Sequence, residues 1–162
     1  MVRPFYQLPA FKNLIVPLLS PRVKKLAGGR YGHRDAVALD LLEEVGFERD
    51  SRVSYKNAGA LPQGYLKRLE LAKGMALRPD LIILDELFSG LSLAEVASIV
   101  PILEKLMLQG KTMIMIEHRL KELFRIADRI MVLNFGEKIA EGASREVMES
   151  DAVKKAYLGS ET

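Results

Sequence analysis

The sequence predicts an α/β fold in which a parallel sheet with crossover helices is joined to a small helical lobe. Three short apolar runs, 81–85, 112–116 and 130–133, have the length and the branched residues of strands, and helical patterns lie between them. Strands that alternate with helices in this way are typical of parallel sheets. Two helical patterns, 35–45 and 64–77, precede the first strand and predict the helical lobe.

The composition is that of a globular protein and excludes several kinds of site. Apolar residues make up 49% of the 162 residues, within the roughly 45–50% of ordinary globular proteins. The chain has no cysteine, which excludes disulfides and thiolate metal sites and fits a reducing compartment. The net charge is +3, with acids and bases interspersed, so we expect no stripe for nucleic acid. No apolar run reaches the ~20 residues that a membrane span needs.

The pattern divides the chain into three parts. Residues 1–34 are predicted to be irregular because prolines interrupt helices there. Residues 35–79 form a helical subdomain, in which 48–62 is a polar loop. Residues 80–162 form the α/β part that ends the chain.

Shorter elements are predicted within the last part. Ser92-Leu93-Ala94-Glu95 is a capping box, and the helix that it begins continues to Gln109. Asn134-Phe135-Gly136-Glu137 is a hairpin turn that leads into a strand at 138–140. We also expect short helices at 120–126, 144–149 and 151–157.

The stretch Leu81-Ile82-Ile83-Leu84-Asp85-Glu86 is central to the functional prediction. Its four apolar residues predict a strand that is covered on both faces. The two acids would then emerge at the carboxyl end of the strand, where open α/β sheets place their ligands. Adjacent strand residues point to opposite faces, so one acid can hold a hydrated cation while the other reaches a water that attacks phosphate. The stretch has the form of a Walker B motif, although a strand with a solvated end has the same form.

Two stretches imitate a phosphate-binding loop, and neither qualifies. Gly59–Gly64 has the glycine spacing, but Tyr65 follows where lysine is required. Gly110-Lys111-Thr112 has the end of the motif, but it lies between a helix and a strand, whereas the loop must lead from a strand into a helix. The chain therefore contains no Walker A motif.

Other motifs stand in a fixed order around the acidic pair. Gln7 lies near the start, Leu61-Pro62-Gln63-Gly64-Tyr65 precedes a helix, Ser89-Gly90-Leu91-Ser92 follows the acids, and His118 follows the next strand. This order resembles the ATP-binding subunit of ABC transporters. The likeness is greatest to the subunits of branched-chain amino-acid importers. Their Q-loop is similar to Val2–Gln7 followed by Phe11–Leu14, and their C-terminal tail is similar to Gly136–Gly142 followed by Ala156–Gly159. The resemblance implies a partial P-loop NTPase (ABC ATPase) fold that lacks the first strands and the Walker A loop.

The resemblance also implies roles in handling ATP and Mg²⁺. Gln7 would sense the γ-phosphate and Mg²⁺ and link them to the helical lobe. Asp85 would hold Mg²⁺ through water, and Glu86 would orient or deprotonate the attacking water. His118 would contact the γ-phosphate.

Two further loops would lie between subunits. In the family, the signature loop caps ATP held by the opposite subunit, and here it would contain Leu61, Gln63, Gly64 and Tyr65. Gly64 begins a helix whose N–H groups suit a phosphate. The D-loop, with Ser89 and Gly90, would also lie between the subunits.

Several residues depart from the family pattern. Pro62 stands where a serine usually binds the γ-phosphate, and Tyr65 replaces a glutamine. Leu87 replaces a proline, and Ser92 replaces an aspartate or asparagine. These changes concern the capping of ATP between subunits and leave Asp85, Glu86 and His118 in place.

Three functional hypotheses follow. The first is the C-terminal portion of an importer ATPase that is peripheral on the cytoplasmic side of the membrane. Its partners would be a transmembrane permease and a second ATP-binding subunit, and we expect no nucleic-acid partner. We expect no ATPase activity from this chain alone, because nothing in it cradles the phosphates. The second is a truncated, non-catalytic relative that binds a full-length partner. The third is a nucleic-acid-linked ABC ATPase, which the lack of a basic block and the importer-like tail disfavour.

Overall fold

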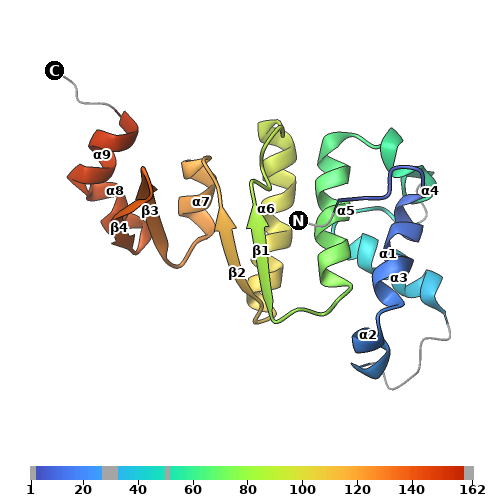
Figure 1. The fold of residues 1–162 in the computed structure, drawn as a ribbon. Coiled ribbons are helices and arrows are strands. Elements are labelled where there is room, and N and C mark those ends of the chain that lie inside the picture. Colours follow the sequence, from blue (N-terminus) through green and yellow to red (C-terminus); the bar gives the residue numbers. More distant parts are fainter. Residues whose placement is uncertain (1–2, 27–32, 50–51, 159–162) are drawn as a thin grey trace. The chain divides into compact units, whose positions relative to one another are not determined.

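The computed structural model of the chain describes residues 3–26, 33–49 and 52–158 (Figure 1). Val2 and Gly159, at the ends of the two importer-like stretches, lie outside these ranges. The chain forms two compact units, Met1–Glu117 and His118–Thr162. The division falls directly after Glu117, and the organisation into parts 1–34, 35–79 and 80–162 stays a prediction.

The first unit contains a group of helices followed by a parallel strand pair. The predicted helices at 35–45 and 64–77 and the helix that follows the capping box are confirmed, with ends that shift by one or two residues. No helix within the described ranges is both long enough and apolar enough to cross a bilayer. In chain order the elements are α1 (Ala10–Leu18), α2 (Pro21–Leu26), α3 (Arg34–Glu44), α4 (Arg52–Tyr55), the 3-10 turn η1 (Ala58–Ala60), α5 (Gln63–Met75), β1 (Leu81–Asp85), α6 (Leu93–Leu108) and β2 (Thr112–Ile116).

The prediction of irregular structure over 1–34 is wrong for residues 10–18 and 21–26, where α1 and α2 form, whereas residues 3–9 contain no helix. The prolines occupy positions that helices tolerate. Pro9 is the N-cap of α1, Pro21 begins α2, and Pro17 lies in the last turn of α1, where it removes only one backbone hydrogen bond. The predicted loop at 48–62 likewise contains α4 and η1.

The parallel pairing of β1 with β2 is confirmed, with Leu81 opposite Thr112 and Asp85 opposite Ile116. Helix α6 is the crossover between the two strands, and Figure 1 shows this arrangement. The last residue of β1 and the last residue of β2 therefore reach the same edge of the sheet.

The prediction that β1 is covered on both faces is wrong. Exposure alternates along the strand: Ile82 and Leu84 are buried, whereas Leu81 and Ile83 are 46% and 55% exposed. Ile114 and Ile116 of β2 are also about half exposed, at 48% and 55%. Parallel sheets normally have both faces covered, so one face of this sheet is aliphatic and open to solvent.

The second unit is a hairpin packed against three helices. It contains α7 (Leu120–Ile126), β3 (Ile130–Asn134), β4 (Glu137–Gly142), α8 (Ser144–Glu149) and α9 (Asp151–Leu158). The predicted hairpin and helices are confirmed, and Phe135 and Gly136 at the turn both have positive φ, as a two-residue hairpin turn requires. The prediction that the third strand continues the parallel sheet is wrong, because β3 pairs antiparallel with β4 in a separate sheet. Their core contains Ile130, Val132, Val147 and Val153.

The two faces of β1 give a first prediction. Leu84→Ala should lower the free energy of unfolding by about 2–5 kcal/mol, because it leaves a cavity under a fully buried side chain. Ile83→Ala, on the open face, should lower it by less than about 1 kcal/mol. Urea unfolding followed by circular dichroism measures both values. Equal losses would show that the face of Ile83 is covered in solution, and light scattering on the same samples would reveal covering by self-association.

Candidate functional site

The acidic pair lies at the carboxyl end of the parallel sheet, as predicted. Asp85 is the last residue of β1, Glu86 follows it, and both side chains are exposed. Glu86 has a positive φ of 49°, which is uncommon for a residue other than glycine. Its backbone is held at both ends: its N–H donates to the Ile116 carbonyl at 2.9 Å, and Nζ of Lys67 donates to its carbonyl at 3.2 Å. The backbone is fixed while both carboxylates remain open to ligands.

The turn after the acidic pair is also fixed by hydrogen bonds. The Ser89 N–H donates to the Glu86 carbonyl at 3.1 Å, and Gly90 has a φ of 76°. The Phe88 N–H donates to Oε1 of Glu117 at 2.7 Å. Glu117 was not among the predicted site residues, although an acid directly after a strand, level with the acidic pair across the sheet, is a signal that could have identified it. Glu117 therefore joins the end of β2 to the predicted D-loop.

Gln7 lies in an exposed turn before α1. The side chain of Asn13 is fully buried and makes hydrogen bonds to the backbone of this turn. Its oxygen accepts from the Phe5 N–H, and its amide group donates to the carbonyls of Phe5, Leu8 and Pro9 at 3.1–3.3 Å. One buried amide therefore supplies the acceptor for the Phe5 N–H and adds to the backbone hydrogen bonds of three carbonyls around Gln7.

The Gln7 turn is also tied to the segment that precedes the predicted signature loop. The Gly59 N–H donates to the Tyr6 carbonyl, and the Ala58 N–H donates to the Leu8 carbonyl, each at 2.9 Å. A Cβ atom on Gly59 would lie 3.3 Å from the Tyr6 carbonyl oxygen, so the close approach favours glycine. Leu61 follows this segment directly and is buried.

Helix α5 contributes a buried lysine to the same region. Lys73 is 2% exposed, its Nζ donates to the Arg3 carbonyl at 2.6 Å, and it lies 4.4 Å from the centre of the Phe5 ring. Burial lowers the pKa of Lys73, and the nearby Glu70 carboxylate opposes this only in part. Lys73 thus connects α5 to the chain just before Gln7.

The predicted signature loop begins α5. Gln63 is its first residue and is exposed, Gly64 is buried, and the Tyr65 ring packs edge-on against Phe47 with 4.9 Å between ring centres. The sequence analysis expected the Gly64 N–H to be available for a phosphate. In the structure it donates to Oε1 of Glu95 at 3.1 Å.

Glu95 therefore serves two helices. Its other oxygen, Oε2, accepts from the Ser92 N–H and hydroxyl, each at 2.8 Å, and so completes the predicted capping box of α6. Hydrogen bonds from Ser92, and a further one from Gly64, hold the pKa of Glu95 below its usual value.

His118 is the first residue of the second unit. Its expected position beside Asp85 and Glu86 therefore stays a prediction. No three or more histidine, aspartate or glutamate side chains are grouped as a metal site within the described ranges. Asp85 supplies a single exposed carboxylate, which suits a Mg²⁺ ion held mainly by water and nucleotide oxygens.

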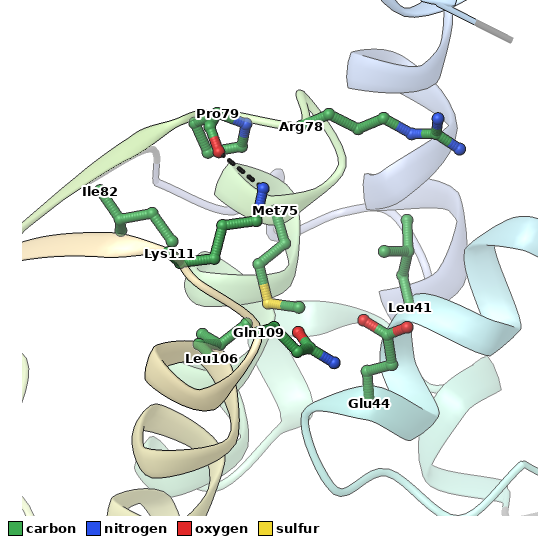
Figure 2. Close-up of a pocket in the computed structure, with 9 residues that line it drawn as sticks. All are labelled: Leu41, Glu44, Met75, Arg78, Pro79, Ile82, Leu106, Gln109 and Lys111. Atoms are coloured by element: carbon green, nitrogen blue, oxygen red, sulfur yellow. Dashed lines mark hydrogen bonds between the residues drawn. The ribbon is translucent and has the colours of Figure 1, made fainter.

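A cavity of about 210 Å³ in the first unit lies elsewhere (Figure 2). Ile82, near the start of β1, and Leu106 and Lys111, before β2, line it, and Nζ of Lys111 donates to the Pro79 carbonyl at 3.0 Å. It therefore lies toward the amino ends of the strands, whereas Asp85 and Glu86 are at the carboxyl ends, where α/β sheets bind ligands.

Comparison with known proteins identifies relatives that match nearly the whole chain. The chain is 32% identical to the high-affinity branched-chain amino acid transport ATP-binding protein BraF of Pseudomonas aeruginosa, over 98% of this chain and 65% of BraF. It is also 32% identical to the lipopolysaccharide export system ATP-binding protein LptB of Escherichia coli, over 78% of this chain and 51% of LptB. The chain thus spans less than two thirds of the length of these relatives. No family model matches it.

Solved structures show the same fold. An ATP-binding cassette of an ABC transporter in its ADP conformation superposes with a TM-score of 0.72 at 25% identity, over 95% of this chain and 64% of that one. The dimeric structure of a bacterial ABC transporter cassette superposes with a TM-score of 0.70 at 25% identity, over 88% and 59%. The predicted ABC ATPase fold is therefore confirmed.

The hydrogen bonds between the Asn13 side chain and the Gln7 turn, here called the Asn13 clamp, give a second prediction. Asn13→Ala should lower the free energy of unfolding by about 1–3 kcal/mol, because it removes the buried acceptor of the Phe5 N–H. Asn13→Asp keeps this acceptor but buries a carboxylate against the carbonyls of Phe5, Leu8 and Pro9, so its loss should be at least as large. Urea unfolding measures both, with Lys12→Ala on the exposed side of α1 as the control. A value for Asn13→Ala within about 0.5 kcal/mol of the wild type would contradict the clamp.

The lowered pKa of Glu95 gives a third prediction. A carboxyl group with a lower pKa in the folded state stabilises the fold at pH values above its unfolded value, 4.5, and loses this contribution as pH falls through the folded value. The wild type should therefore lose stability below pH 4.5, and Glu95→Gln should lose less. Urea unfolding between pH 7 and pH 3 measures the difference. Parallel curves for the two proteins would contradict it.

Proposed function

Because this chain belongs to the family of ABC transporter ATP-binding proteins, we propose that it is the C-terminal portion of the ATP-binding subunit of an importer, where it couples ATP binding and hydrolysis to transport. One observation supports this most. The Gln7 turn, the predicted signature loop, the acidic pair and the predicted D-loop lie in one compact unit, and hydrogen bonds link the segments that contain them.

The proposed chemistry is phosphoryl transfer from ATP to water. Bound Mg-ATP would supply the γ-phosphate and the ion that neutralises developing charge. Asp85 would hold the ion through water, and Gln7 would reach the ion and the γ-phosphate. The Glu86 carboxylate would orient the attacking water or accept its proton, and His118 would contact the γ-phosphate.

The proposed partners are a transmembrane permease and a second ATP-binding subunit, with no role for nucleic acid. Phe5 and Tyr6, about half exposed beside Gln7, offer an apolar contact for the permease. The dimeric cassette that superposes on this chain supports pairing with a second subunit. These partners would place the chain on the cytoplasmic side of a membrane, as a peripheral component.

The proposed substrate class is branched-chain amino acids. It is supported by the match to BraF, which is 32% identical over 98% of this chain. A transport assay would test it with a chimera that joins this chain to the part of BraF that it does not match. The chimera should restore leucine uptake to cells that lack the importer subunit, and it should not restore lipopolysaccharide export to cells that lack LptB.

A second candidate is a non-catalytic relative that binds a full-length cassette. It is favoured by Pro62 in place of the signature serine and by the open face of Ile83 and Ile116. Such a chain would bind its partner through the signature loop and D-loop without hydrolysing ATP.

ATP hydrolysis separates the two candidates and gives a fourth prediction. The purified chain should release no phosphate from ATP above the buffer rate. A chimera that joins it to the part of BraF that it does not match should hydrolyse ATP, and Glu86→Gln should slow that chimera by roughly 100-fold or more. Glu137→Gln, in the hairpin turn of the second unit, is the charge-matched control.

The outcomes are distinct. Turnover by the purified chain would contradict the need for a completing segment. A folded chimera that binds ATP without turnover would contradict the importer proposal and favour the non-catalytic relative.

A further inference from the structure

The carboxylate of Glu95 lies at the meeting point of two helix N-termini. Oε1 accepts from the Gly64 N–H in the first turn of α5, and Oε2 accepts from Ser92, the N-cap of α6. Gly64 and Glu95 are 31 residues apart in sequence, so this contact is tertiary. Ordinary capping of α6 requires only the bonds to Ser92, and the bond to Gly64 is additional.

The surroundings of Gly64 are shaped around this carboxylate. A Cβ atom on Gly64 would lie 2.9 Å from Oε1 of Glu95 and 3.1 Å from its Cγ. Even alanine at this position would therefore displace the carboxylate. A second link one turn further along α5 keeps the helices together, because Arg68 donates to the Ser98 hydroxyl at 2.5 Å, and this hydroxyl donates to the Glu95 carbonyl at 2.6 Å.

The contact occupies the end of α5 that attracts anions. Backbone N–H groups in the first turn of a helix and the helix dipole both favour negative charge there. Glu95 supplies that charge from within the chain. An approaching phosphate would have to share the Gly64 N–H with the carboxylate and would also meet its like charge at close range. Pro62, the N-cap of α5, has no hydroxyl with which to offset this cost.

We propose that Glu95 is an internal anion that occupies the phosphate-binding end of α5, so that the terminal phosphate of a nucleoside triphosphate on a second subunit binds only when it displaces this carboxylate. The proposal rests on the proposed function, because it concerns the signature loop of the same site. Glu95 thereby weakens the capping of ATP between subunits.

Displacement would have a structural consequence at the D-loop. The carboxylate that leaves Gly64 is the same group that accepts from Ser92, at the end of the D-loop. Phosphate binding at the signature loop would therefore alter the hydrogen bonds between Glu95 and Ser92 that cap α6. Glu95 is in this sense a positioning residue between the two loops.

Nuclear magnetic resonance of the full chain tests this, with inorganic tripolyphosphate as the probe. The wild type, Glu95→Gln and the control Glu137→Gln are each titrated at low salt, and the amide signals of Gly64 and Tyr65 are followed. Glu95→Gln should bind about tenfold more tightly than the wild type, because a like charge is removed. The difference should shrink in 1 M salt, because screening weakens interactions between partly exposed charges. The control should match the wild type.

A second variant, Glu95→Asp, keeps the proposal testable if Glu95→Gln does not fold. It keeps the charge but shortens the side chain away from Gly64, so its affinity for tripolyphosphate should lie between the other two. Equal affinities in all the variants, or binding that leaves the Gly64 signal unmoved, would overturn the proposal. This result is separate from that of the chimera: hydrolysis by the chimera with equal affinities here would overturn only the role of Glu95, and an inactive chimera would overturn only the importer proposal.

Discussion

The parallel pairing of β1 with β2 determines where the chemically important groups of the first unit lie. The pairing extends one residue past the strands, because the Glu86 N–H donates to the Ile116 carbonyl. This bond places Glu86 in its left-handed conformation directly after Asp85. The next residue of the other strand, Glu117, then receives the Phe88 N–H and fixes the turn that follows. The end of one sheet thus positions both the acidic pair and the D-loop.

The open face of this sheet has the composition of a covered one. In a sheet with one face in solvent, the residues on that face are usually polar. Here the outward positions of the two strands include four aliphatic residues, Leu81, Ile83, Ile114 and Ile116. Four aliphatic side chains about half exposed on one small surface are costly in water. The relatives BraF and LptB have length that this chain does not span, which is consistent with further structure over this face in a complete cassette.

Features with a local pattern could be predicted from the sequence, and features that depend on distant contacts could not. The capping box, the hairpin turn and the strand that ends at Asp85 each have their signal within a few residues. Helix α1 was missed because four prolines in the opening segment suggested irregular structure, and a proline's effect depends on where a helix begins. The contacts of Asn13 with the Gln7 turn, of Lys73 with Arg3 and of Glu95 with Gly64 leave no periodic signal, because packing alone brings those groups together.

The links between the N-terminal end of α5 and its neighbouring elements are suited to exchange. Along its length α5 is held by buried apolar residues such as Leu69 and Ala72. At its N-terminal end it is linked to α6 and to the acidic pair by a few polar bonds, from Gly64 to Glu95, from Arg68 to Ser98 and from Lys67 to the Glu86 carbonyl. Each of these bonds involves a charged side chain, and such bonds contribute about 1.5–3 kcal/mol each. Because they are few and lie at one end of the helix, they can be exchanged for other polar bonds while the packed body of α5 keeps its fold.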